Sequence, residues 1–282
     1  MAAPAKPATM AAKPLPGLAD LPAAFTLHAF DSVASTNAEA ARLARGGASD
    51  LTLVWAREQT AGRGRFDRRW ASGRGNLFCS TVLRLADPRG AETLSLVAAL
   101  ATADAIVSLL RPTAGPSPEN ADRRVRVKWV NDVLLDDAKV SGCLCEAALD
   151  EGWIVVGIGI NVGHAPGLRN ESPGGTADRP VAYRATCLRE AGITADIETA
   201  LAALARSVER RIGQWRAGGF AGVLHADYAA RLWRMDETIR VGLDAEGRAA
   251  VSGINRGVSE GGHLRIELAD GTIRTIHAGD VL

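Results

Sequence analysis

The chain between residues 124 and 162 is a run of short apolar segments separated by acidic and glycine turns. At residues 124–129, apolar side chains recur at every second position, with Lys128 on the opposite, polar face, and this period is typical of a β-strand. The turns Asp136-Asp137 and Asp150-Glu151-Gly152 then separate three more strand candidates, at 133–135, 139–149 and 153–162. Since turns this short join neighbouring antiparallel strands, we expect an antiparallel meander.

The segments before and after this run mix helices with further strands. Residues 92–110 carry apolar side chains at spacings of three and four, as in a helix that packs on a core. Ser35-Thr36-Asn37 is typical of the start of a helix, which we expect to end at Gly46-Gly47. The other expected elements are strands at 25–30, 51–57 and 76–85, a loop at 111–122, an irregular stretch at 163–180, and helices at 197–216 and 220–233. Together they indicate an α+β fold with a mixed, largely antiparallel sheet.

The pattern changes at about Met235. Four short strand candidates follow, at 238–242, 248–255, 263–268 and 272–277, with an Asp270-Gly271 hairpin turn, and they predict a small β-barrel. At the other end, residues 1–24 are rich in Ala, Pro and Lys, which predicts a disordered tail. We therefore divide the chain into this tail, a main domain at 25–234 and a small domain at 235–282.

Composition argues against several classes of protein. The 33 basic and 32 acidic residues leave a net charge of +1 over 282 residues, so no global field favours nucleic acid or an anionic membrane. Asp104 interrupts the longest apolar run, at 94–110, and a membrane span needs about 18 to 20 apolar residues. The cysteines are Cys79, Cys143, Cys145 and Cys187. Without a secretory signal they indicate reduced thiols in the cytoplasm, and their spacing predicts no metal site.

One expected loop alternates glycine with arginine. In Gly62-Arg63-Gly64-Arg65, glycine lets the backbone approach a ligand closely, and planar guanidinium groups match pairs of carboxylate or phosphate oxygens. A solvated connector or a nucleic-acid patch has a similar composition. The loop by itself therefore predicts an anion site without selecting a function.

A second motif, Lys128-Trp129-Val130-Asn131-Asp132, places a lysine inside an apolar strand pattern. Two cations and a pliable glycine loop suit a site that brings two anions together against their repulsion, as when a nucleotide activates a carboxylate. The alternatives are a lysine on an edge strand and a simple turn at Asn131-Asp132.

Taken together, these motifs resemble those of the biotin protein ligases, of the kind without an amino-terminal DNA-binding domain. The resemblance covers nearly all of the chain after the tail and is carried by Glu58-Gln59-Thr60-Ala61-Gly62-Arg63-Gly64-Arg65, Trp70, Lys128-Trp129-Val130-Asn131-Asp132, Lys139, Gly142 and Gly157-Ile158-Gly159-Ile160-Asn161-Val162. It implies a catalytic domain like that of class II aminoacyl-tRNA synthetases and lipoate ligases, with an SH3-like barrel at the carboxyl end. It also implies that biotin and ATP form biotinyl-5′-adenylate and pyrophosphate. A lysine of a biotin carboxyl carrier protein domain, as in acetyl-CoA carboxylase, would then take the biotinyl group.

The resemblance also implies roles for single residues. Arg65 and Lys128 are the expected catalytic pair, in contact with both the biotin carboxylate and the α-phosphate of ATP. The other residues implied in biotin binding are Ser35, Thr36, Asn37, Gln59, Gly62, Arg63, Gly64 and Gly142. Those implied in ATP binding are Arg68, Trp70, Asn131, Lys139, Gly159 and Asn161. Mg²⁺ would neutralise the leaving pyrophosphate, and we expect no metal site made by the protein alone.

Some of these residues have simpler interpretations. Ser35-Thr36-Asn37 suits a plain helix cap, and a tryptophan such as Trp70 suits a core anchor. Gly157-x-Gly159 resembles half of a dinucleotide-binding fingerprint, but no Rossmann unit surrounds it, so we expect its glycines to let ATP lie on the strand.

The sequence departs from the family pattern at three positions. Phe66 and Asp67 stand where the family commonly has arginine and glycine, so the loop loses a positive charge and backbone freedom. These two changes put the retention of the adenylate in question. Val130 stands where proline is usual, which leaves every functional group in place.

Three other functions compete with biotin ligation. A lipoate or octanoate ligase shares the fold, and an inactive homologue would hold biotin or its adenylate without turnover. A nucleic-acid-binding module would use the arginines, but the balanced charge and the missing helix-turn-helix argue against it. Ser35-Thr36-Asn37 and the Gly/Arg loop favour biotin. We expect a cytoplasmic enzyme with a carrier-domain partner and no nucleic-acid or membrane partner, and we leave a homodimer open.

Overall fold

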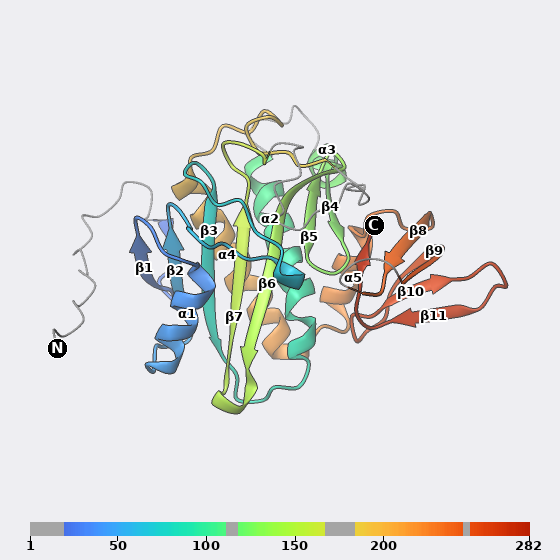
Figure 1. Cartoon of the computed structure of the whole chain (residues 1–282), viewed down its shortest axis with the longest axis horizontal. Coiled ribbons are helices and arrows are strands. Elements are labelled where there is room, and N and C mark those ends of the chain that lie inside the picture. Colours follow the sequence, from blue (N-terminus) through green and yellow to red (C-terminus); the bar gives the residue numbers. More distant parts are fainter. Residues whose placement is uncertain (1–19, 111–117, 167–183, 245–248) are drawn as a thin grey trace.

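The computed structural model describes residues 20–110, 118–166, 184–244 and 249–282, and its main body is a seven-stranded sheet (Figure 1). The strand order is β1-β2-β3-β7-β6-β5-β4. These strands are β1 (Thr26–Phe30), β2 (Thr52–Ala56), β3 (Leu77–Arg84), β4 (Val125–Lys128), β5 (Asp132–Leu135), β6 (Ala138–Ala148) and β7 (Trp153–Ile160). β1 and β2 are parallel, and every other neighbouring pair is antiparallel. The predicted meander is confirmed as β4-β5-β6-β7.

Helices cover both faces of this sheet, because successive side chains of each strand point to opposite sides (Figure 1). α1 (Thr36–Arg45) packs on one face, in a small apolar cluster that includes Val54. α2 (Leu94–Leu110) and α4 (Ile197–Gly218) pack on the other face, in a larger core that includes Trp55. Both expected long helices are therefore confirmed; α2 packs on the sheet, and α4 packs mainly on α2.

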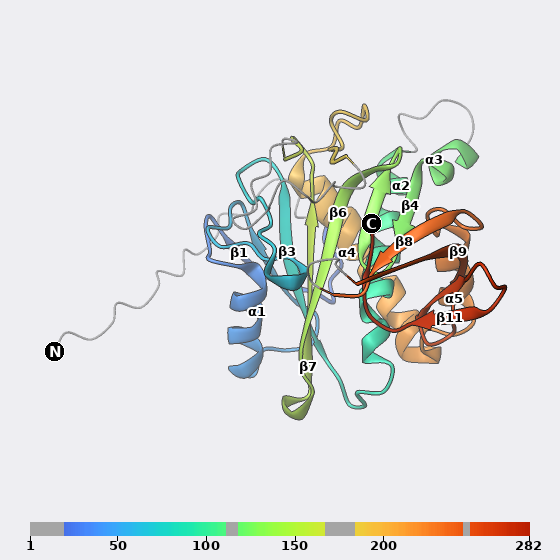
Figure 2. The ribbon, with the colours of Figure 1, turned by 45° about the vertical axis from the view of Figure 1, so that its right-hand side comes forward.

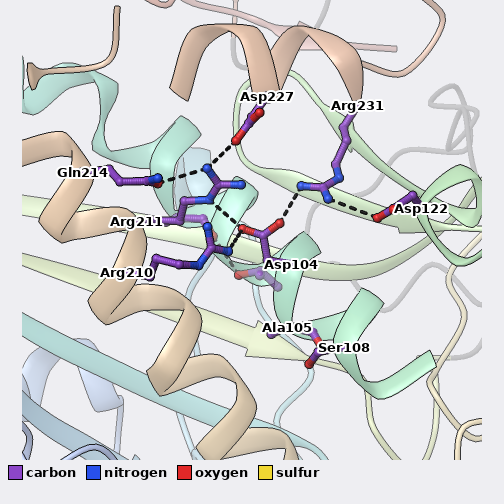
Figure 3. Close-up of polar contacts among 11 residues, drawn as sticks. Asp104, Ala105, Ser108, Asp122, Arg210, Arg211, Gln214, Asp227 and Arg231 are labelled. Atoms are coloured by element: carbon purple, nitrogen blue, oxygen red, sulfur yellow. Dashed lines mark hydrogen bonds and ion pairs between the residues drawn. The ribbon is translucent and has the colours of Figure 1, made fainter. Parts of the chain in front are cut away.

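α2 is an apolar core helix with one acidic residue. The span Ala91–Leu110 is long and apolar enough to cross a membrane by length and composition, but most of it is buried inside the protein. The carboxylate of Asp104 accepts from three guanidinium groups, those of Arg210, Arg211 and Arg231, each at 2.6 Å (Figure 3). Arg211 also pairs with Asp227 of α5 (Val223–Ala230). This network ties α2 to α4 and to the chain around α5.

The segment that follows α5 runs along the outer edge of β4. The Val127 amide donates to the carbonyl of Arg231 at 2.9 Å, and the Trp233 amide donates to the carbonyl of Val127 at 2.8 Å. β4 is the last strand in the sheet order, and these bonds pair it on its second side too. Lys128 follows Val127 directly, so it comes immediately after the residue whose backbone is bonded on both sides of β4.

The loop predicted at 111–122 is wrong in its second half, because α3 spans Pro118–Arg124. Proline suits the first turn of a helix, where its missing N–H costs no hydrogen bond, and the glutamate, alanine and arginines that follow are good helix formers. Residues 111–117 lie outside the described residues. The irregular stretch predicted at 163–180 also lies outside them, apart from its first four residues.

The carboxyl-terminal residues form a second sheet, antiparallel throughout, in the order β11-β10-β9-β8-β12 (Figure 2). Its strands are β8 (Thr238–Gly242), β9 (Ala250–Val258), β10 (Leu264–Glu267), β11 (Ile273–Ile276) and β12 (Asp280–Val281). The first four confirm the predicted strands to within a few residues. β12 escaped prediction because two residues carry no period. Gly271 takes the left-handed backbone of the expected hairpin turn, at φ +81°.

Candidate active site

A cavity of about 560 Å³ opens between α1, the Gly/Arg loop and strands β6 and β7. All but two of the predicted site residues line it: Ser35, Thr36, Asn37, Gln59, Arg63, Gly64, Arg65, Arg68, Trp70, Asn131, Lys139, Gly142, Gly159 and Asn161. The two exceptions are Gly62 and Lys128. A second cavity, of about 470 Å³, lies among Arg123, Arg126 and Arg231, and no predicted site residue lines it.

The start of α1 serves both as a helix cap and as a polar wall of the cavity. Ser35 caps the helix by accepting from the amide of Ala38. The amide and hydroxyl of Thr36 both donate to Oε1 of Gln59, at 2.8 and 3.1 Å. The Gln59 amide in turn donates to Oγ of Ser72 at 2.9 Å. Only the first residue of the Ser35-Thr36-Asn37 triplet is used as the cap, and all three line the cavity.

Two polar residues that the sequence analysis did not select organise this wall. Oγ of Ser80, a fully buried residue of β3, lies 2.8 Å from Oγ1 of Thr36 and 2.6 Å from Oδ1 of Asn37. Glu146 of β6 accepts from Nδ2 of Asn37 at 2.6 Å and from the Arg63 guanidinium at 2.7 Å. A serine inside the apolar run of β3 was a visible signal. The partners of Glu146 follow only from the sheet register.

The Trp70 ring lies over two predicted site glycines, Gly142 of β6 and Gly159 of β7. A Cβ on Gly159 would come within 2.6 Å of the indole, and one on Gly142 within 3.0 Å. Gly159 and Gly142 therefore make room for the Trp70 ring. The indole Nε1 is buried and has no hydrogen-bond partner among the described residues, and Lys139 Nζ lies 5.5 Å from the ring centroid.

Gly62 belongs to the Gly/Arg loop but does not itself line the cavity. Its carbonyl accepts from the Trp70 amide at 3.0 Å, and a Cβ at this position would lie 2.8 Å from the Trp70 carbonyl oxygen and would also meet Ser72. Only glycine allows this approach. Its effect on the site is to seat Trp70.

Two of the loop arginines that line the cavity, Arg65 and Arg68, reach the carboxyl-terminal sheet. Arg65 donates to Oδ1 of Asn131 at 3.4 Å and to the carbonyl of Gly279 at 3.1 Å. Arg68 donates to the carboxylate of Asp280 at 2.7 Å. Both guanidinium groups therefore lie between the cavity and β12.

Lys128 departs most from its predicted position. Its side chain is 1% exposed, and Nζ donates to the carbonyl of Val281 at 2.8 Å. The carboxylates of Asp132 and Asp280 lie 3.4 and 3.5 Å from Nζ. Burial lowers the pKa of Lys128, and the two carboxylates counteract that effect in part. The lysine thus lies behind the cavity wall, covered by β12, rather than on an open polar face of the sheet.

The Asn131-Asp132 pair is more than a turn. Nδ2 of Asn131 donates to the carbonyl of Cys143 at 2.6 Å, while its Oδ1 faces Arg65. Asp132 binds Lys139 Nζ at 2.5 Å and faces Lys128 in the strand register. Both residues line the cavity. Asp132 therefore joins the buried lysine to the lysine that faces the cavity.

Phe66 takes a backbone conformation that is rare for a bulky residue. Its φ is +56°, in the left-handed region, and its ring is 43% exposed. The Arg65 and Arg68 guanidinium carbons lie 4.8 and 5.5 Å from the ring centroid. Phe66 thus contacts both arginines where the family has an arginine. The side chain of Asp67, and any pairing of it with Arg68 or Arg69, lies outside the described structure.

Metal-binding and thiol chemistry find little support in this cavity. Within the described part of the chain, no group of three or more His, Cys, Asp or Glu residues is placed to hold a metal ion. The four cysteines are free, and burial raises the pKa of the Cys143 thiol and brings that of Cys145 to about 11. What the cavity offers is cations, amides and hydroxyls, which bind and orient anions and polar rings.

The sequence and the fold both match known proteins. The sequence model of the biotin/lipoate A/B protein ligase family matches residues 29–163. A biotin--[acetyl-CoA-carboxylase] ligase of Paracoccus denitrificans is 38% identical over 237 residues, which cover 82% of this chain and 89% of the relative. The ligase of the same name from Mycobacterium tuberculosis is 35% identical over 253 residues, which cover 88% and 85%. The biotin protein ligase from Aquifex aeolicus, solved in complex with biotin and ATP, superposes with a TM-score of 0.67 at 26% identity, covering 91% of this chain and 97% of that one. The chain therefore belongs to the biotin/lipoate A/B protein ligase family and, within it, to the biotin protein ligases.

Proposed function

We propose that this protein activates biotin with ATP and transfers it to a lysine of a biotin carboxyl carrier protein domain, such as that of acetyl-CoA carboxylase. The observation that carries the proposal is that one cavity joins the polar wall of Thr36, Asn37 and Gln59 to the cations of Arg65 and Lys139. The wall suits the ureido ring of biotin, which both donates and accepts hydrogen bonds. The cations suit a carboxylate and a phosphate.

In the first step, a biotin carboxylate oxygen attacks the α-phosphorus of ATP, and the bond to the pyrophosphate oxygen breaks. Negative charge builds on the α-phosphate oxygens, and the guanidinium groups of Arg65 and Arg68 are placed to bind it. In the second step, the neutral amine of the acceptor lysine attacks the biotinyl carbonyl and releases AMP. No side chain need form a covalent bond, because holding two substrates in attack geometry removes roughly 7 to 11 kcal/mol from a barrier.

Lys128 is the second catalytic cation in this proposal. Its ammonium contacts Asp132, which lines the cavity. On the other side it donates to the backbone carbonyl of Val281. From this position, directly behind the cavity wall, its positive charge favours the negative charge that builds on the substrates. Trp70 supplies an aromatic surface on which adenine can stack.

Several finer features belong to the same proposal. Mg²⁺ enters bound to ATP and neutralises pyrophosphate, as suits an ion that keeps its waters and takes few protein ligands. The domains are 25–234 and 235–282, and the carboxyl-terminal sheet closes as an SH3-like barrel. The enzyme works in the cytoplasm on a carrier domain, with no nucleic-acid or membrane partner, and a homodimer is compatible with this activity.

The test is an assay of pyrophosphate release by purified protein with ATP, Mg²⁺ and either biotin or lipoate, followed by transfer to an acceptor domain. We expect turnover with biotin, and a fall of orders of magnitude in Arg65→Ala and Lys128→Ala while circular dichroism shows that both variants stay folded. Turnover with lipoate alone would establish the runner-up, a lipoate or octanoate ligase. Biotin binding without turnover would mark a weak homologue, the outcome that Phe66 and Asp67 raise.

A further inference from the structure

The carboxyl-terminal domain contacts three of the cations on which the proposed function depends. The carbonyls of Gly279 and Val281 accept from Arg65 and Lys128, and the Asp280 carboxylate lies between Arg68 and Lys128. These contacts join residues more than 150 positions apart in the sequence. Residues 279–281 therefore form one wall of the cation cluster.

Asp280 is carried by a fixed element. β12 pairs with β8, with Asp280 opposite Gly242 and Val281 opposite Val241, and Val281 is buried. Just before it, the backbone of Gly279 approaches Gly242 so closely that a Cβ would lie 2.6 Å from the Gly242 carbonyl oxygen. The position of the carboxylate is therefore set by the sheet, and it does not depend on a long flexible side chain.

We propose that Asp280 is a positioning residue for the adenylation step, whose two carboxylate oxygens hold the Lys128 ammonium and the Arg68 guanidinium at a fixed separation. Oδ2 accepts from Arg68 at 2.7 Å, and Oδ1 lies 3.5 Å from Lys128 Nζ. The side chain of Asp280 is 15% exposed and that of Lys128 is 1% exposed, so solvent screens their contact weakly. This role rests on the proposed function, because it concerns the same cations.

The charges around Lys128 explain why a second carboxylate is needed there. Burial and the neighbouring Lys139 of β6 both favour the neutral amine, while Asp132 of β5 and Asp280 of β12 favour the ammonium. Asp132 is shared, since it also binds Lys139 at 2.5 Å. Two further titratable groups lie near Asp132, Tyr228 of α5 and Cys143 of β6, and burial raises the pKa of each, so both stay neutral. Asp280 thus supplies a second carboxylate beside Lys128, through Oδ1, while its Oδ2 accepts from Arg68.

A different role for Asp280 makes the opposite prediction. A carboxylate between two cations can act as a stand-in for phosphate, which ATP must displace. Removing such a competitor would tighten ATP binding, whereas removing a positioning group weakens the use of ATP. The sign of the change therefore separates the two roles.

The experiment compares Asp280→Asn and Asp280→Glu with the wild type, and with Glu260→Gln as a control that removes an exposed acid from the same domain. Pyrophosphate release with biotin, ATP and Mg²⁺ gives kcat and KM for ATP across the neutral and alkaline range. For Asp280→Asn we expect kcat/KM for ATP to fall by about ten-fold to about one-hundred-fold, the range for a charge-assisted hydrogen bond. We also expect the alkaline limb of the pH profile to move to lower pH, because Lys128 loses its proton more easily. Asp280→Glu should recover part of the loss, and Glu260→Gln should match the wild type.

Each outcome has one meaning. Wild-type protein without biotin-dependent pyrophosphate release would refute the proposed function and leave Asp280 without a reaction to serve. An active wild type with an unchanged or higher kcat/KM for ATP in Asp280→Asn would refute the positioning role alone. A loss of activity in Asp280→Asn with an unmoved alkaline limb and no recovery in Asp280→Glu would also refute it, since a merely structural defect behaves in that way.

Discussion

Replacing Asp104 with asparagine should destabilise the protein without touching the cavity. The side chain of Asp104 is 9% exposed, and its carboxylate binds Arg210, Arg211 and Arg231 (Figure 3). Asparagine keeps the size of the side chain but removes its charge. Arg211, whose side chain is 4% exposed, would then keep Asp227 as its carboxylate partner.

The magnitude follows from the burial of this pair. Removing one partner of a buried ion pair costs about 3 to 5 kcal/mol. Since Arg211 keeps Asp227 and Arg210 is about half exposed, we expect the lower end, about 3 kcal/mol. For a chain of this size each 1 kcal/mol shifts Tm by roughly 2 to 4 °C, so Tm should fall by about 6 to 12 °C.

The pH dependence of the effect has a defined sign. Burial by itself would raise the pKa of Asp104, but the hydrogen bond from Arg211 and the charges of Arg231, Arg211 and Arg210 outweigh it, so the pKa lies below its ordinary value of 3.8. The stabilisation by Asp104 is therefore fully present above pH 3.8 and is lost as the pH falls through the lower value of the folded state. The difference in Tm between the wild type and Asp104→Asn should hold at neutral pH and shrink at acid pH.

The measurement is urea-induced unfolding at neutral pH, repeated in acid, with Asp87→Asn as the control. Asp87 pairs with Arg89 on the surface, so its replacement should leave the unfolding midpoint unchanged within error. A loss below about 1 kcal/mol in Asp104→Asn, with the same dependence on urea, would refute the view that this carboxylate holds the helices together.

Three further predictions concern the cavity. Gly159→Ala should displace the indole of Trp70 and lower the free energy of unfolding by about 1 to 3 kcal/mol. It should also raise KM for ATP and alter tryptophan fluorescence, and an unchanged KM would contradict the seating of Trp70 by this glycine. Ser80→Ala should remove about 1 kcal/mol of hydrogen bonding beside Asn37 and weaken biotin binding about five-fold in calorimetry, with equal affinity as the contrary result. Glu146→Gln should change KM for biotin by less than about five-fold, because the ion pair of Glu146 with Arg63 is exposed. Glu146→Ala also removes the acceptor for Asn37 and should raise KM further. A larger change in Glu146→Gln than in Glu146→Ala would exclude this acceptor role.

Local patterns predicted most of the fold. The period of two in β4 and the short turns of the meander depend on neighbouring residues only, so they could be read directly. α3 was missed because a proline and serine run before it is typical of a loop, and β12 because two residues have no period. The domain limits and barrel closure stay predictions.

The site was predicted as a set of residues, and its geometry was not. Motif residues such as Arg65 and Asn161 line one cavity, as expected from the resemblance. The contact of Lys128 with Val281 could not be predicted, because Val281 belongs to a strand 153 positions away. The partners of Glu146 depend on which residues of β6 face α1, and no sequence period specifies that.

The pairing of Val127 with the chain after α5 limits how this protein can associate with other chains. An edge strand with free amides and carbonyls invites a strand from another molecule, which leads to sheet extension or to aggregation. At Val127 both groups are already bonded to the backbone of Arg231 and Trp233. A second copy that pairs strand against strand at Val127 would first have to displace the segment that leads to the carboxyl-terminal sheet, so the chain protects this edge with its own backbone.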